Sequence, residues 1–176
     1  MLKVKGFTLI ELLIALVIIG VAISATFPTL TNIIANNKLT IQHNNLIRAI
    51  SLTRSEAIKR GQRVSLCQSS DMLTCTKDSA NWNHGWVIFV DSNEDNQIDS
   101  ADSILRVQQK VAGMNISFGA RTRISYHPDG IAVGASNGTF LFFDYRGNDS
   151  KKGLVISISG RIRLANKSDL VSKSCF

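Results

Sequence analysis

The sequence has 176 residues and a formal net charge of +7 at pH 7. This length fits one ordinary domain with an additional element, and the absence of an internal repeat excludes a repeat array. The positive charge favours a polyanionic partner such as nucleic acid or acidic lipid, but it does not constrain the fold.

The N-terminal segment is almost uncharged. Between Lys5 and Lys38 the only charged residue is Glu11, and the run LLIALVIIGVAISATF with its flanks is long enough to cross a hydrocarbon core of about 30 Å. Lys3 and Lys5 precede the run, so the positive-inside rule leaves the short N-terminus in the cytoplasm and the chain after Lys38 outside. A cleaved signal peptide is the alternative, but the apolar run is longer than the apolar region of a usual signal peptide.

The carboxylate of Glu11 is unusual in this setting. An isolated charge at membrane depth is costly, so we expect it to mark a site with a specific cationic partner. The alternative is that the side chain reaches the membrane interface or is protonated.

Beyond residue 35 the pattern becomes amphipathic, and the helix is expected to run to about Arg60 and to end at Gly61. Its apolar stripe should pack on a globular head. The stripe consists of Leu39, Leu46, Ile50 and Ala57.

After Gly61 short apolar runs alternate with turns. The runs that indicate strands are RVSLCQ, GWVIFVD, ILRVQQKV, NISFG, RISYH, FLFFDY and LVISISGRIRLA. Such a series in roughly a hundred residues predicts antiparallel β structure. The predicted fold class is therefore α+β: a long N-terminal helix, partly transmembrane, packed on an antiparallel β-sandwich or curved-sheet head. Trp86, ahead of a strand, is expected in its core.

Three cysteines fit an oxidising compartment with one disulfide and one remaining thiol, although cytosolic free thiols are the alternative. Cys67 with Cys75 is the preferred pair because the loop between them is short. Cys175 could instead pair with either of them.

The turn DSNEDNQIDSAD, residues 91–102, places side-chain oxygens at alternating positions, as in a calcium loop. Asn96 stands where such a loop needs glycine, and strands rather than helices flank it. A solvated turn whose side chains cap their own backbone is therefore favoured, and no metal is predicted. The candidate calcium ligands are Asp91, Asn93, Asp95, Asp99 and Asp102.

No catalytic motif is apparent. His43, His84 and His127 do not have the spacing of a zinc site, and no nucleophile motif of the G-x-S-x-G type accompanies them. We expect that the chain is not an enzyme and uses no cofactor.

The segment KGFTLIELLIALVIIGVAISATFP resembles the class III leader and N-terminal helix of type IV pilins and pseudopilins. The resemblance implies that a prepilin peptidase cuts between Gly6 and Phe7 and methylates the new amino group. In that family a glutamate at the position of Glu11 pairs with the amino terminus of a neighbouring subunit in the filament. The implied location is the bacterial inner membrane, with the head in the periplasm, and then an extracellular pilus with other major and minor pilins.

The head resembles the FimT/GspH group of minor pilins and pseudopilins. The residues that carry this resemblance are GWVIFVD (85–91), the Asp/Asn-rich turn, ILRV (104–107) and GRIR (160–163). In FimT-type minor pilins a C-terminal Gly-Arg-x-Arg element is associated with DNA binding in natural transformation, which implies the same role for this element.

The excess positive charge lies in the last third of the chain, where residues 121–176 hold nine Lys or Arg and four Asp. Arg161 and Arg163 share one face of an extended segment, about 6.6 Å apart, and Gly160 lets a backbone approach a ligand closely. The same charges on an edge strand can instead serve only to prevent aggregation. The other candidate DNA contacts are Lys151, Lys152, Lys167 and Arg146.

The predicted organisation is a leader (1–6), a transmembrane and filament-core helix (7–34), an amphipathic helix (35–61), a β-rich head (62–159) and a basic tail (160–176). The leading hypothesis is a minor type IV pilin that binds extracellular double-stranded DNA without reading its sequence, for uptake in natural transformation. The alternative is a structural minor pseudopilin that primes or caps the filament of a type II secretion system.

Overall fold

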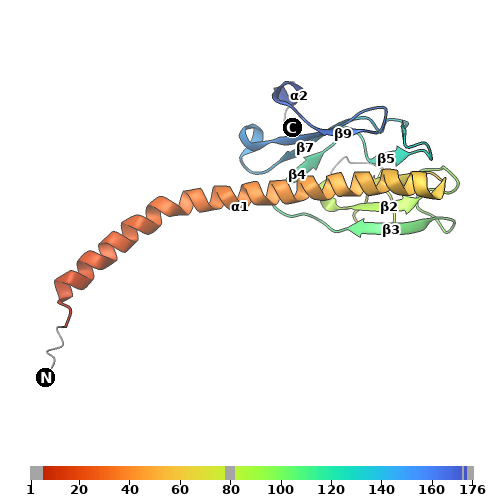
Figure 1. The fold of residues 1–176 in the computed structure, drawn as a ribbon. Coiled ribbons are helices and arrows are strands. Elements are labelled where there is room, and N and C mark those ends of the chain that lie inside the picture. Colours follow the sequence, from red (N-terminus) through yellow and green to blue (C-terminus); the bar gives the residue numbers. More distant parts are fainter. Residues whose placement is uncertain (1–5, 78–81, 172, 174–176) are drawn as a thin grey trace. The chain divides into compact units, whose positions relative to one another are not determined.

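The structure, a computed structural model, describes residues 6–77, 82–171 and 173. The rest of the predicted leader and Cys175 lie outside these residues. The chain divides into two compact units, one up to Lys38 and one from Leu39 onward. Helix α1 (Leu9–Arg60) contributes its first part to the former and its last part to the latter (Figure 1).

The first unit is built on the apolar part of α1. This helix is long and apolar enough to cross a membrane, and large side chains from Phe7 to Ile34 are exposed along it. The transmembrane prediction of the sequence is consistent with this exposed apolar surface.

Helix α1 ends where the sequence predicts. The backbone of Gly61 has a φ of 64°, and its N–H donates to the carbonyl of Ala57 at 3.0 Å. A residue in the left-handed region at this position is a common helix stop, and glycine adopts it without steric cost.

The predicted stripe on the last part of α1 is buried. Leu39, Leu46, Ile50 and Ala57 each have no exposed surface and belong to the main hydrophobic cluster of the head. The stripe follows the helical period, so one face of α1 covers the sheets while the other carries polar side chains.

Two antiparallel sheets form the head, with strand orders β3-β2-β1-β5-β6 and β4-β7-β8-β9 (Figure 1). The strands of the five-stranded sheet are β1 (Val64–Gln68), β2 (Trp86–Val90), β3 (Ser103–Gln108), β5 (Arg123–Tyr126) and β6 (Ala132–Val133). Those of the four-stranded sheet are β4 (Asn115–Ser117), β7 (Gly138–Phe143), β8 (Lys152–Ile156) and β9 (Ile162–Leu164). The remaining elements are the 3₁₀ helices η1 (Trp82–His84) and η2 (Gly147–Ser150) and the short helix α2 (Lys167–Val171).

The α+β prediction is confirmed, including the antiparallel pairing. Strand β1 lies in the middle of its sheet and is buried along its whole length. Leu66 on this strand pairs with Ile88 on one side and with Ile124 on the other. Apolar neighbours across both ladders explain why this continuous apolar run occupies a central position.

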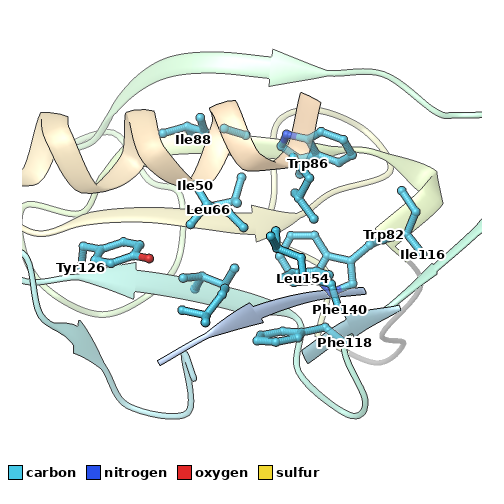
Figure 2. Packing of buried hydrophobic residues seen from close by; sticks show 14 of the residues in the cluster. Ile50, Leu66, Trp82, Trp86, Ile88, Ile116, Phe118, Tyr126, Phe140 and Leu154 are labelled. Atoms are coloured by element: carbon cyan, nitrogen blue, oxygen red, sulfur yellow. The ribbon is translucent and has the colours of Figure 1, made fainter. Parts of the chain in front are cut away.

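An aromatic cluster fills one end of the core (Figure 2). The rings of Phe118 and Phe140 stack with centroids 4.0 Å apart, and the Trp82 ring meets Phe140 edge-on at 5.0 Å. The indole N–H of Trp82 donates to the carbonyl of Arg121 at 2.9 Å, so its polar atom is satisfied. Trp86 is also in the core, as predicted.

The C-terminal region differs from the prediction. The run LVISISGRIRLA contains two strands, β8 and β9, joined by a turn around Gly160. The predicted basic tail therefore contains regular structure between residues 162 and 171: β9 is the edge strand of the four-stranded sheet, and α2 follows it. Polar and apolar residues alternate through the turn as they do in a strand, so the sequence pattern does not indicate that β8 ends at Ile156.

A disulfide joins Cys67 in β1 to Cys75, with the Cα atoms 5.6 Å apart. This is the pair that the sequence favours, and it closes a loop that begins at the end of the central strand. The disulfide thereby ties the end of β1 to a segment outside the helices and strands.

Replacing Phe140 with Ala should lower the free energy of unfolding by about 3–5 kcal/mol, because it removes a ring that is fully buried between Phe118 and Trp82. Leu73 is a control with 66% of its surface exposed, and its replacement by Ala should cost no more than about 0.5 kcal/mol. Urea unfolding followed by tryptophan fluorescence measures both. Equal losses in the two variants would contradict the assignment of this cluster to the core.

Candidate nucleic-acid interface

The turn between β8 and β9 presents Gly160 and Arg161. The N–H of Gly160 donates to the carbonyl of Ser157, and the N–H of Ser157 donates to the carbonyl of Arg161, both at 2.9 Å. Gly160 has a φ of 76°, and a Cβ there would lie 2.4 Å from the carbonyl oxygen of Gly130 and 2.7 Å from the Tyr126 ring. Only glycine fits this position, so close packing explains why the GRIR element begins with glycine.

Neighbouring elements anchor this turn. The hydroxyl of Tyr126 donates to the carbonyl of Gly160 at 3.2 Å. Burial raises the pKa of Tyr126 to about 12, so the hydroxyl stays a donor at neutral pH. From α1, the Arg54 guanidinium donates to the carbonyls of Gly130 at 2.9 Å and Ser159 at 3.4 Å. The turn is thus tied to a strand, a helix and a second turn.

Arg161 projects from this anchored turn. Its side chain is exposed, and among the described residues it has no ion pair or side-chain hydrogen bond. It borders a shallow surface cleft of about 490 Å³. The residues that line the cleft are Ser51, Arg54, Ser55, Ile58, Gly160, Arg161 and Ile162.

Arg163 lies on β9 and has an internal partner. Its guanidinium donates to both carboxylate oxygens of Asp169 in α2, at 2.6 and 3.0 Å. This pair lowers the pKa of Asp169 to about 2 and raises that of Arg163. About half of the Arg163 side chain remains exposed, at 53%, so a phosphate can compete with the carboxylate for it.

Arg161 and Arg163 flank Ile162, which packs against the core. Because successive side chains of an extended chain point to opposite sides, both arginines project away from the core, as predicted from their spacing. The structure therefore keeps them on one face but gives a competing carboxylate to Arg163.

The lysines differ in their surroundings. Lys152 donates to the hydroxyl of Thr40 and Lys151 to the carbonyl of Lys173, each at 2.7 Å. Lys167 is exposed at the start of α2. Neither pair neutralises a lysine charge, but both fix the direction of the ammonium group.

Arg146 is bound within the head. It makes a two-pronged pair with Asp144, with distances of 2.6 and 3.1 Å, and both side chains are mostly buried, at 15% and 5% exposed. Hydrogen bonds from Arg146 lower the pKa of Asp144. Arg146 is among the candidate DNA contacts predicted from the sequence. In the structure its guanidinium is instead bound to the carboxylate of Asp144.

The Asp/Asn-rich turn directs its oxygens mainly at its own backbone. Asp102 accepts from the N–H groups of Ser92 and Asp99, and Asn93 and Asp95 each accept from the N–H two residues later. Asn96 does adopt a positive φ, 66°, at the position where a calcium loop has glycine.

Three of the proposed calcium ligands approach one another. Oxygens of Asp91, Asp95 and Asp102 lie within 4.8 Å of one another, but Asp91 is buried and already accepts from Ser65 at 3.2 Å. Arg63 also lies 3.9 Å from Asp91, so a cation is already present beside it. The favoured interpretation as a self-capping turn agrees with these contacts.

Glu11 has a local partner at the start of α1. Its N–H donates to the Thr8 hydroxyl at 3.3 Å, and its carboxylate accepts from the Thr8 N–H at 3.4 Å. This reciprocal arrangement is a capping box, and its sequence signature T-x-x-E is present at residues 8–11. Capping satisfies otherwise unpaired N–H groups and places a negative charge at the positive end of the helix.

Arg54 and Tyr126 are the residues of the site that sequence reasoning missed. Each reaches the β8–β9 turn from a distant part of the chain: 105 residues separate Arg54 from Ser159, and 34 separate Tyr126 from Gly160. No local pattern reports such contacts.

A long apolar N-terminal helix followed by an antiparallel β head defines a pilin-like protein. The family model described as type II transport protein GspH matches residues 42–160, and the prokaryotic N-terminal methylation motif matches residues 1–27. The chain belongs to the GspH family of pilins and pseudopilins. The family and the motif imply processing by a prepilin peptidase and assembly with other pilins.

Solved structures with the same fold come from two filament systems. The type IV minor pilin FimU of Pseudomonas aeruginosa is 24% identical, with a TM-score of 0.63 over 80% of this chain and 96% of that one. The minor pseudopilin EpsH from the type II secretion system of Vibrio cholerae is 13% identical, with a TM-score of 0.51 over 73% and 96%. No curated protein sequence matches this chain.

Replacing Asp144 with Asn should destabilise the head by about 1–3 kcal/mol at neutral pH, because it removes the charged acceptor of a mostly buried arginine. Since folding lowers the pKa of Asp144, its stabilising contribution is present above the usual value and is lost as the pH falls through the folded value. The difference between wild type and variant should therefore shrink in acid. Unfolding curves at neutral and acidic pH measure this.

A double-mutant cycle provides the control for that prediction. Combining Asp144→Asn with Arg146→Gln should cost less than the sum of the two single changes, because each removes the same interaction. Strict additivity would mean that the pair does not stabilise the fold.

Proposed function

We propose that this chain is a minor type IV pilin that binds double-stranded DNA through the β8–β9 turn, for DNA uptake in natural transformation. The observation that supports this most strongly is Arg161: an exposed guanidinium without an internal partner among the described residues, on a turn held by Tyr126 and Arg54. Because the backbone of this turn is already fixed, only the Arg161 side chain has to be ordered when it binds a phosphate.

The chemistry of the turn suits phosphate rather than base edges. A guanidinium offers forked donors to phosphate oxygens, and the hydroxyls of Ser51 and Ser55 line the same cleft. The cleft is shallow and has no element that would enter a DNA groove. Binding should therefore be independent of sequence and strongly dependent on salt.

Arg163 and Lys167 extend the surface, and the two differ in availability. Lys167 is exposed, whereas Arg163 must leave Asp169 or share its donors before it can hold a phosphate. We assign the first contact to Arg161 and a second, weaker one to Arg163. Arg146 has no part in this proposal.

Processing and assembly complete the proposal. Cleavage between Gly6 and Phe7 frees an amine at Phe7, one residue before Thr8 of the capping box. In the filament Glu11 would pair with the amine of a neighbouring subunit, exchanging its local Thr8 contacts for a charged partner. The head would face the periplasm before assembly and the exterior afterwards.

Replacing Arg161 with Gln should weaken binding of labelled duplex DNA by at least about fivefold, since a charged hydrogen bond is lost. The slope of log affinity against log salt should fall by about 0.9, the value for one phosphate contact. Fluorescence anisotropy at low and moderate salt measures both. Arg106→Gln is the matched control, because Arg106 is an exposed arginine on β3 in the other sheet. If both variants lost the same affinity for DNA, binding would be explained by general electrostatic attraction and not by a specific contact of Arg161.

Replacing Asp169 with Asn should strengthen DNA binding by roughly two- to fivefold, because it frees Arg163 from an exposed ion pair. The control is Asp95→Asn, which removes the same charge from an exposed side chain that has no ion pair among the described residues. The same anisotropy titration applies. If both variants gained equally, Arg163 would have no specific role.

A structural role in a type II secretion filament is the second candidate, and the description of the matching family model favours it. In that case the wild-type protein would not bind duplex DNA even at low salt, and deleting the gene would abolish protein export. The same titration therefore separates the two candidates.

A further inference from the structure

A second cluster of arginines lies on another face of the head. A cleft of about 330 Å³ opens beside the start of β5 and the end of β6. Its polar and charged lining consists of Arg63, Asn96, Arg121, Thr122, Arg123 and Ser136.

This cleft lies on the side of the five-stranded sheet that faces away from α1. Ile124 and Tyr126 of β5 are buried in the cluster that includes the α1 stripe; Figure 2 shows Tyr126 and Ile50 of this cluster. Arg123 and Ser125 alternate with them and therefore point to the opposite face. The Arg161 turn contacts Arg54 of α1, so the two arginine clusters are separate surfaces.

The charges of this cleft are only partly balanced. Arg63 lies 3.3 Å from the carboxylate of Glu94 and 3.9 Å from that of Asp91. Arg121 and Arg123 have no carboxylate partner within the described part of the chain. Arg121 is instead held with its guanidinium 5.3 Å from the centre of the Phe118 ring. A net positive charge thus remains in a concave site.

Donors in and around this cleft also lack acceptors. The Nε–H groups of Arg63 and Arg121 are buried and have no hydrogen-bond acceptor. Ser136 of the lining accepts from the N–H of Ser125 at 2.9 Å, and the Ser125 hydroxyl lies 2.8 Å from that of Ser65. These contacts fix the position of Ser136 in the lining.

We infer that this cleft is a binding site for an oxyanion, a carboxylate or phosphate group of a small ligand. Guanidinium forks match both groups, and Thr122 is a further polar residue of the lining. The volume admits a small molecule but not a duplex. The inference does not depend on the proposed DNA binding, because it concerns other residues on another face.

Calorimetric titration of the full chain in a non-ionic detergent tests this inference. The probes are sodium phosphate and sodium acetate, each at constant ionic strength maintained with chloride. We expect saturable binding of at least one anion and a loss of about tenfold or more in affinity for Arg123→Gln. Arg123 is exposed, so its replacement should leave the fold intact.

Two further variants separate this site from the DNA surface. Arg106→Gln should bind the anion as the wild type does, and Arg161→Gln should retain the saturable binding that Arg123→Gln removes. Binding of phosphate alone would identify a phosphate ester as the natural group, and binding of acetate alone a carboxylate. No saturable binding of either anion, or binding that survives Arg123→Gln unchanged, would overturn the inference. Neither result would affect the DNA titrations of Arg161→Gln.

Discussion

The head depends on the burial of one apolar stripe of α1. Leu39, Leu46, Ile50 and Ala57 have no exposed surface, and residues of both sheets belong to the same cluster. Removing apolar surface from water is the dominant favourable term in folding. Because this stripe fixes which face of each sheet is interior, it also decides which side chains of the strands and turns are left to meet a ligand.

The net charge of this protein therefore does not tell which arginines are available to a ligand; the partner of each arginine does. Arg146 is paired with Asp144, and Arg163 is paired with Asp169. The backbone of Arg161 is held in the turn, but its guanidinium is exposed to solvent. An exposed ion pair contributes little to stability, so the pair of Arg163 with Asp169 adds little to the stability of the fold. Arg54 shows the complementary case, a cation used to position a turn.

The capping box formed by Thr8 and Glu11 explains how a carboxylate is accommodated at the start of an apolar helix. The side chain satisfies the first N–H groups of α1 and complements the positive end of the helix. Both of these contacts lie within a single subunit, so the Glu11 carboxylate has hydrogen-bond partners without any neighbouring chain.

The sequence by itself determined the elements whose signals are local: the extent of α1 and its stop at Gly61, most strands, the favoured disulfide and the leader motif. Such features follow from hydrophobic period, turn residues and short loops. The separation of the basic third into an anchored turn, an internal pair and a second cleft was decided only by tertiary structure. Arg63 and Arg123 line one cleft because β1 lies beside β5 in the sheet, and Tyr126 contacts Gly160 because two sheets close over one core. Contacts between residues far apart in the chain leave no periodic trace, so no local pattern predicts them.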